Sequence, residues 1–167
     1  GEEGEEGPAA QEPEEEEEGG IEVSTKDEGF PFFDAATGAL VRTVEVTEVV
    51  AAYTFPRDGA ILSLFPHTHL RGSAFRYELV QPDGSSELLL DLPRYDFNWQ
   101  LVYQLREPLA VAAGTVLRAT AWYDNSASNP ANPDPTSEVR WGEQTFEEMM
   151  IGYLDWVPTG PPPTETV

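Results

Sequence analysis

Most of the chain alternates between short apolar runs and turn residues, a pattern typical of a β-rich protein. Residues 40–50 (LVRTVEVTEVV) are rich in β-branched side chains, and residues 75–80 (FRYELV) alternate apolar and polar positions. Turn signals at 58–59 (Asp-Gly) and 82–84 (Pro-Asp-Gly) separate such runs. Residues 51–55 continue the first run as strand, and further strands are expected at residues 60–65, 87–92, 97–105, 115–123 and 149–157. The pattern predicts an all-β fold, one antiparallel β-sandwich of jelly-roll type with about eight or nine strands.

The two ends of the chain lack this pattern. Residues 1–20 contain only Glu, Gly, Pro, Ala and one Gln, so they cannot bury enough apolar surface to offset the entropy of ordering them. We expect a disordered acidic tail or linker there, a sandwich over 21–157 with its core from about residue 40, and a Pro-rich tail over 158–167. The segment before the core is expected to pack against the sandwich edge through Phe30, Phe32 and Phe33.

Charge narrows the range of partners. The sequence has 31 acidic residues against nine Lys and Arg, a formal net charge of −22. Ten of the acids lie in residues 1–20, so 21 acids against nine bases leave about −12 on the rest. Nucleic acid is not expected as a partner, because its phosphates require clustered Lys and Arg, and an anionic membrane surface is disfavoured for the same reason. The acidic excess is expected to serve solubility.

Several classes of protein are excluded or unsupported by absent features. No cysteine is present, which excludes disulfides, thiolate metal sites and a cysteine nucleophile. Serines occur without a G-x-S-x-G context, so a serine hydrolase is not supported. No run approaches the roughly 18–20 apolar residues of a membrane-spanning helix, and no signal peptide opens the chain. Because the sequence does not begin with Met, we expect it to be a piece of a longer protein.

Both histidines of the chain, His67 and His69, lie within PHTHLRG at residues 66–72. Residues i and i+2 of a strand project from the same face, close enough to share one metal ion. Imidazole suits copper, zinc, iron and nickel. The same pair also fits two exposed or hydrogen-bonded histidines, so it does not define a site by itself.

The residues leave the third ligand open. Asp and Glu are abundant, which permits a His-His-carboxylate zinc or iron site. The two methionines, Met149 and Met150, are adjacent near the start of an apolar run, so at most one of them lines a given site. A thioether ligand favours copper, especially Cu(I), whereas a methionine without a metal commonly fills a core.

Two other segments have both a structural and a functional interpretation. Within the expected strand at 97–105, Trp99 is expected in the core, and Asn98 or Gln100 is a candidate hydrogen-bond partner for a ligating histidine. The Asn-, Asp- and Pro-rich segment at 124–140 is long enough to suggest a functional loop. Its acidic residues fit no EF-hand spacing, and turn chemistry explains them equally well.

Several motifs in order resemble one family. PHTHLRG at 66–72 followed by QTFEEMMIGY at 144–153 resembles the second copper domain of the copper type II, ascorbate-dependent monooxygenases, which include peptide- and dopamine-hydroxylating enzymes. RYDFNWQ at 94–100 and YDNSASNPANPDP at 123–135 resemble secreted microbial members of this family. The resemblance covers about residues 53–157, roughly two thirds of the chain.

The resemblance implies a ligand set. His67 and His69 match the two histidine ligands of the family's second copper, and Met149 matches its thioether ligand. The acidic pair at 147–148 favours this methionine over its neighbour. Tyr153 matches a tyrosine that contacts substrate in the peptide-hydroxylating enzymes. The implied cofactor is one copper ion, which binds dioxygen beside the substrate C–H bond.

Two departures from the peptide-hydroxylating enzymes bear on the substrate. Phe65 stands where those enzymes have an arginine that holds the peptide carboxylate, and Ile151 stands where they have an asparagine. Recognition of a peptide C-terminus is therefore not expected. Arg71 lies nearby in the sequence, but nothing in the sequence assigns it that role.

The implied function is that of the O2-activating C-terminal domain of a copper monooxygenase, which hydroxylates a substrate C–H bond with ascorbate or another one-electron donor. The family holds a second copper through three histidines of a preceding domain, and this sequence has no histidine left for one. We therefore expect a preceding copper domain as partner and an incomplete enzyme in this chain. The alternative is a non-catalytic copper-binding or interaction sandwich. A secreted or periplasmic location is implied by the resemblance only.

Overall fold

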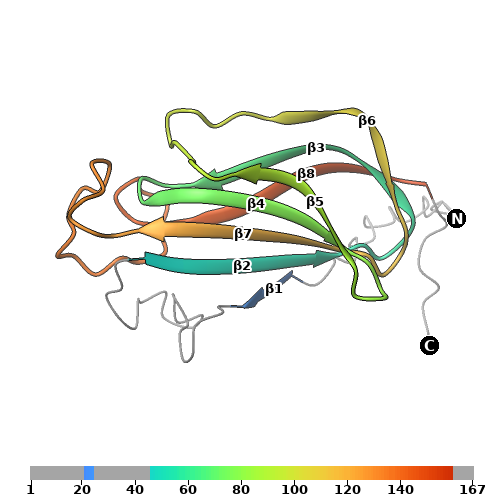
Figure 1. The fold of residues 1–167 in the computed structure, drawn as a ribbon, viewed down its shortest axis with the longest axis horizontal. Helices are drawn as coiled ribbons and strands as arrows, with labels where there is room; N and C mark the ends of the chain where they lie inside the picture. The colour runs from blue at the N-terminus through green and yellow to red at the C-terminus, as the bar shows by residue number, and fades with distance from the viewer. Residues whose placement is uncertain (1–20, 25–45, 160–167) are drawn as a thin grey trace, which may run out of the picture.

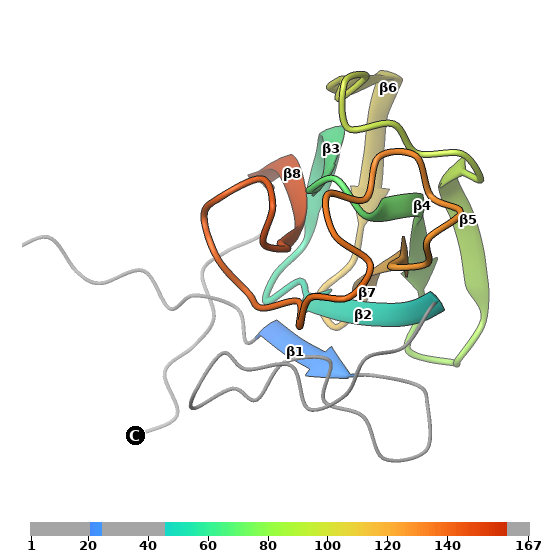
Figure 2. The ribbon, with the colours of Figure 1, turned by 90° about the vertical axis from the view of Figure 1, so that its left-hand side faces the viewer.

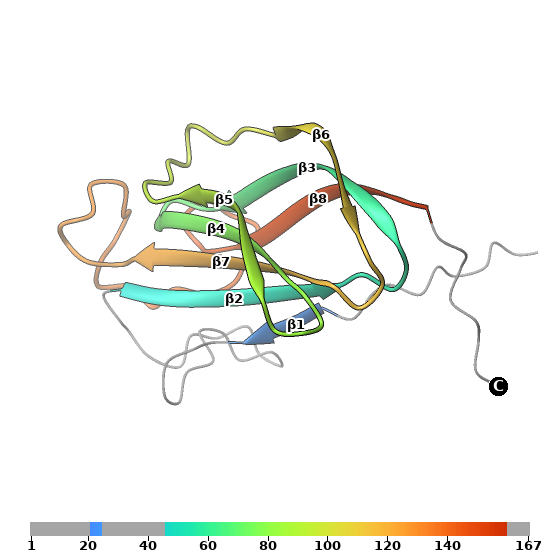
Figure 3. The same ribbon diagram turned by 45° about the vertical axis from the view of Figure 1, so that its right-hand side comes forward.

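Eight strands in two antiparallel sheets make up the structure, a computed structural model that describes residues 21–24 and 46–159. The five-stranded sheet has the order β1 (Ile21–Ser24), β2 (Val46–Thr54), β7 (Val116–Asp124), β4 (Gly72–Val80) and β5 (Ser86–Leu92). The three-stranded sheet has the order β6 (Tyr103–Val111), β3 (Gly59–Thr68) and β8 (Met150–Pro158). Figures 1 and 3 show the sheets as two layers. The predicted all-β antiparallel sandwich is confirmed.

The core lies between the two layers and follows from the period-two pattern of the strands. In β7 every second residue from Leu117 to Tyr123 is buried, and the residues between them, Arg118, Thr120 and Trp122, point to the other face. Phe75 and Tyr77 of β4 continue this apolar face, and Ile61 and Leu64 of β3 meet it from the opposite sheet. The stripes of both sheets thus close over one hydrophobic core.

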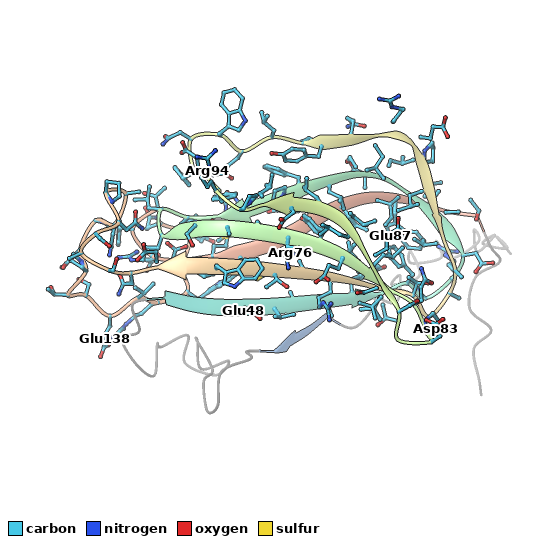
Figure 4. All side chains as sticks on the ribbon, in the orientation of Figure 1. Glu48, Arg76, Asp83, Glu87, Arg94 and Glu138 are labelled. Atoms are coloured by element: carbon cyan, nitrogen blue, oxygen red, sulfur yellow. The ribbon has the colours of Figure 1, made fainter. Side chains whose placement is uncertain are left out.

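Charged pairs cover the outer face of the five-stranded sheet. Arg118 pairs with Glu78 across β7 and β4 at 3.0 Å, and Arg76 pairs with Asp91 across β4 and β5 at 3.0 Å. The Arg76 guanidinium also lies 5.4 Å from the centre of a neighbouring tryptophan ring. Figure 4 shows Arg76 and Glu48 on this face. Such a face is suited to water rather than to a further protein layer.

Three connections meet at one end of the sandwich. They are the short β3–β4 turn, the β5–β6 connection at 93–102 and the long β7–β8 loop at 125–149. Figure 2 faces this end. Because β3 ends and β8 begins there, the histidine motif and the methionine pair are brought to the same place, although about 80 residues separate them in the sequence.

The structure corrects one strand assignment and leaves others outside its scope. Residues 97–105 were expected to form one strand, but β6 starts only at Tyr103 and extends to Val111. Asp96 explains the late start, since its side chain accepts the Asn98 N–H at 2.8 Å and its carbonyl accepts the Trp99 N–H at 2.8 Å, which forms a turn. Trp99 is 68% exposed, so its expected place in the core is wrong.

Residues 1–20 and 160–167, with the three early phenylalanines, lie outside the described residues, and the domain boundaries remain predictions. The last strand, β8, ends at Pro158. Within the described ranges no helix has the length and apolar character needed to cross a membrane.

Candidate metal centre

The two histidines lie at the end of β3, on its outward face. Leu64, Pro66 and Thr68 alternate with Phe65 and His67 along the strand, and the first three are buried. His67 is the next-to-last residue of β3 and is partly exposed, whereas His69 follows the strand directly and is 4% exposed. The strand therefore presents one imidazole to the surface and the other beneath the loops that cover its end.

The two imidazole rings are close enough to share one ion. Their centres are 5.2 Å apart and their planes make an angle of 87°. Since a bond from zinc or copper to imidazole nitrogen is about 2.0–2.1 Å long, two rings on one tetrahedral ion have centres roughly 5 Å apart. The expected close approach of His67 and His69 is thus present in the fold.

A hydrogen-bonded chain fixes the orientation of His67. Its Nδ1 lies 2.6 Å from Oε1 of Gln100, and the Gln100 amide nitrogen donates to the Phe97 carbonyl at 2.9 Å. The second bond sets which end of the amide faces the histidine, so Nδ1 carries the proton and donates it. The Nε2 lone pair is then left for a metal, which is the usual arrangement behind a ligating histidine.

The surroundings of His69 favour its neutral form. Burial lowers the pKa of His69, and the nearby His67 lowers it further, against weaker opposing effects of the Glu147 and Gln144 backbone and the Glu147 charge. Its Nδ1 is buried and has no hydrogen-bond partner. A buried nitrogen without a partner is uncommon and points to a ligand. The donor set therefore fits a metal ion that binds imidazole.

Met149 directly precedes β8, just as His69 directly follows β3. The antiparallel ladder ends at the pair of Thr68 and Met150, so His69 and Met149 each lie one residue beyond it, at the same end of the two strands. The Tyr123 hydroxyl donates to the Met149 carbonyl at 2.8 Å, which fixes the backbone there. Met150 packs against the hydrophobic core instead. The fold thus brings the backbone of Met149 to the histidine end of the sandwich.

A buried ion pair contacts the backbone of this end, and no pattern in the sequence predicts it. The Glu148 carboxylate is fully buried and accepts the backbone N–H groups of His69 at 3.1 Å and Arg71 at 2.7 Å. The Arg71 guanidinium lies 3.8 Å from the same carboxylate. Burial raises the pKa of Glu148 to about 7, and the hydrogen bond from Arg71 and its charge oppose that rise.

Arg71 is committed to this interior network. It is 2% exposed, its Nε donates to Asn125 at 2.8 Å, and its Nη1 donates to the Phe146 carbonyl at 2.8 Å. A guanidinium held in this way is not available at the surface for a substrate carboxylate.

Tyr153 lies on the same outward face as His67. Its ring stacks on Phe65 with centres 5.5 Å apart and planes at 16°, and its centre is 6.4 Å from that of His67. The ring is 46% exposed, while its backbone carbonyl accepts the Tyr77 hydroxyl at 3.1 Å. The tyrosine is therefore fixed beside the histidine with one edge open to solvent.

The other acidic and amide residues of this end serve turns. Asp124, Asn129 and Asp134 each accept the N–H of the residue two positions on, which is the pattern of Asx turns. Among the residues that the structure describes, no three His, Asp or Glu side chains lie together as a metal site.

Comparison with known proteins places the chain in a family. The family model for the copper type II ascorbate-dependent monooxygenase, C-terminal domain, matches residues 42–164, about three quarters of the chain. No curated protein gives a match. The matched region contains both histidines, the methionine pair and every strand from β2 to β8. The chain therefore belongs to the C-terminal domain family of the copper type II ascorbate-dependent monooxygenases.

Proposed function

We propose that this domain binds one copper ion through His67, His69 and Met149 and is the substrate-hydroxylating part of a monooxygenase. The observation that carries the proposal is the 5.2 Å approach of the two imidazoles, one oriented by Gln100 and the other with a buried Nδ1 that lacks a partner. Two imidazoles and a thioether suit Cu(I) better than they suit zinc.

When bound, copper supplies the one-electron chemistry that activates dioxygen. In the net reaction one oxygen atom of O2 is inserted into a substrate C–H bond. The other oxygen atom takes up two protons and two electrons and leaves as water. The electrons come from ascorbate or another one-electron donor. The protein's own residues orient the imidazoles and favour the neutral form of His69. The three connections at this end of the sandwich bury one side of the site.

The substrate meets an uncharged surface beside His67. The stacked Phe65 and Tyr153 form this surface, and Tyr153 is the proposed substrate contact. Arg71 does not supply a cation there, because its guanidinium is held in the interior. We therefore propose that an apolar or aromatic part of the substrate, rather than a carboxylate, rests on this face.

A C-terminal domain in this family implies an N-terminal partner domain. We propose that such a domain holds the second copper and delivers electrons, since both histidines of this sequence lie at the site described above. We also propose a secreted or periplasmic location, on the strength of the family resemblance.

X-ray absorption of the Cu(I)-loaded protein tests the ligand set. We expect one copper per chain with a sulfur neighbour in the wild type and in Met150→Leu, and no sulfur in Met149→Leu. The two variants have the same substitution at adjacent positions, so a difference between them reports on coordination rather than on packing. Sulfur scattering that persists in Met149→Leu would rule out the proposed ligand.

A second candidate function is copper binding without turnover, and the count of two histidines in the sequence favours it. The coding sequence before Gly1 separates the candidates. A preceding β-domain with a histidine pair and a later single histidine supports the enzyme, provided that the longer protein consumes O2 when given ascorbate and copper. Copper binding without O2 consumption supports the binding module.

A further inference from the structure

We propose that Glu148 is a positioning residue that holds the thioether ligand in register with the two histidines. The inference rests on the proposed function, since it takes His67, His69 and Met149 as ligands. Glu148 does not touch the ion in this proposal. It acts through the backbone of the two segments that carry the ligands.

The first argument is where the ladder between β3 and β8 ends. Its last paired residues are Thr68 and Met150, so the strand pairing does not extend to His69 and Met149. Both ligands beyond the ladder are therefore left without its support. The Glu148 side chain replaces it, because its carboxylate accepts the backbone N–H of His69 at 3.1 Å and lies 3.4 Å from the N of Met149.

The second argument is that Glu148 is itself fixed. Its N–H donates to the Arg140 carbonyl at 2.8 Å, and its carbonyl accepts the Gly142 N–H at 3.1 Å. The β7–β8 loop thus holds the backbone of Glu148, and its side chain holds the turn after β3. Because both the backbone and the side chain of Glu148 are held, this residue fixes the turn after β3 relative to the β7–β8 loop, which an exposed carboxylate would not do.

The third argument is that the turn after β3 has little freedom of its own. The Gly72 N–H donates to the His69 carbonyl at 3.2 Å, and a Cβ at Gly72 would collide with the Thr68 side chain. Arg71, within this turn, gives its N–H to the other Glu148 oxygen at 2.7 Å. The carboxylate therefore spans the turn with both oxygens, one on His69 and one on Arg71.

The fourth argument concerns charge. A fully buried carboxylate is costly unless it is paired and hydrogen-bonded, and Glu148 has both kinds of partner. A neutral glutamine would keep the shape but would have one oxygen for the two N–H groups. Its NH2 would then face the N–H of His69 or of Arg71, so one of the two connections is lost.

The test compares Glu148→Gln with Glu147→Gln, the same substitution one residue earlier. Glu147 accepts the Gln144 N–H at 3.0 Å, a contact that glutamine can keep. In Glu148→Gln we expect copper still bound by the histidines, the sulfur contribution lost from the X-ray absorption spectrum of the Cu(I) form, and Cu(I) affinity lower by about 10- to 100-fold. Glu147→Gln should match the wild type in both measurements.

Folding is monitored by circular dichroism on the same samples. If Glu148→Gln does not fold, the double variant Arg71→Met/Glu148→Gln takes its place, because it leaves no unpaired buried cation. A folded variant at position 148 that loses sulfur supports the proposal, and one that keeps sulfur and wild-type affinity overturns it. Sulfur absent from the wild type as well would overturn the proposed ligand set, which is a distinguishable result.

Discussion

The Nδ1 atom of His67 lies 2.6 Å from the side-chain oxygen of Gln100, which comes from the connection between β5 and β6. The contact joins residues 33 positions apart and selects the tautomer of the more exposed histidine. Because Gln100 is also bonded to the Phe97 carbonyl, the amide is oriented before any ion arrives. The imidazole is thus prepared for binding without an entropic cost at the moment of ligation.

Gln100→Leu is therefore expected to lower copper affinity by about 10- to 100-fold, since the imidazole loses its tautomer selection and its orientation. Competition with a chelator of known affinity measures the change. Gln104→Leu is the matched control, because Gln104 is exposed on β6 and has no contact with either histidine in the ladder. Equal losses in both variants would show that the effect is not specific to the His67 contact.

How much of this site was predictable from sequence differs between its parts. The close approach of His67 and His69 was predictable, because residues i and i+2 near a strand end project to the same side. Met149 required the family resemblance, since the pairing of β3 with β8, which brings residues 69 and 149 to the same end of the sandwich, depends on topology that local pattern does not encode. The sequence makes Gln100 a candidate partner of a ligating histidine. Its segment, however, is predicted as a strand, which the Asp96 turn prevents.

The role of Glu148 was not predictable from local pattern. An acidic pair after a polar loop is typical of a solvated surface, and Glu147 and Glu148 look equivalent in sequence. Only the tertiary fold distinguishes them, because the β7–β8 loop turns one carboxylate inward onto Arg71. The core position predicted for Trp99 is wrong for a similar reason. A large aromatic side chain in an apolar run suggests burial, but the turn at Asp96 leaves Trp99 exposed.

The metal-free protein should show a pH-dependent stability that Glu148 controls. The pKa of this carboxyl is raised from 4.5 to about 7, so the folded protein binds more protons than the unfolded chain between these values. Its contribution to stability is then fully present below 4.5 and is lost as the pH rises through 7. His69 has the opposite sign, because its lowered pKa makes a contribution that is present above 6.5 and lost as the pH falls.

Urea unfolding of the wild type and of Glu148→Gln, from about pH 5 to pH 8, isolates the first contribution. The difference in free energy of unfolding between them should fall as the pH rises towards 7 and then level off. Glu148→Gln alone should become more stable as the pH rises towards 6.5, because only the His69 contribution remains. A difference that does not vary with pH would show that Glu148 does not titrate in this range.

The stack of Phe65 on Tyr153 should contribute a measurable coupling energy. Their centres are 5.5 Å apart and their planes nearly parallel, a geometry worth about 0.5–1.5 kcal/mol beyond buried area. A double-mutant cycle with Phe65→Ala, Tyr153→Ala and the double variant measures it from the free energy of unfolding. Copper affinity should stay close to that of the wild type in all three, since neither ring is a proposed ligand. A large loss of affinity would assign the pair to the metal site itself.

The inner face of β8 should be the least tolerant of added volume at Gly152. A Cβ there would lie 2.9 Å from the Ala119 Cβ, closer than real Cβ contacts come, and 3.2 Å from the Tyr77 ring, tighter than most real contacts. Gly152→Ala is therefore expected to destabilise the domain by about 1–3 kcal/mol, because the two sheets must separate or Tyr77 must move. Thermal unfolding of the metal-free protein measures the loss.

Since Ala119 is the nearer obstacle, Ala119→Gly should restore part of the stability when combined with Gly152→Ala, although alone it destabilises β7. If the double variant recovers no stability, the conflict lies at Tyr77 instead. Because the Tyr77 hydroxyl donates to the Tyr153 carbonyl, a displaced Tyr77 would also shift Tyr153 beside His67.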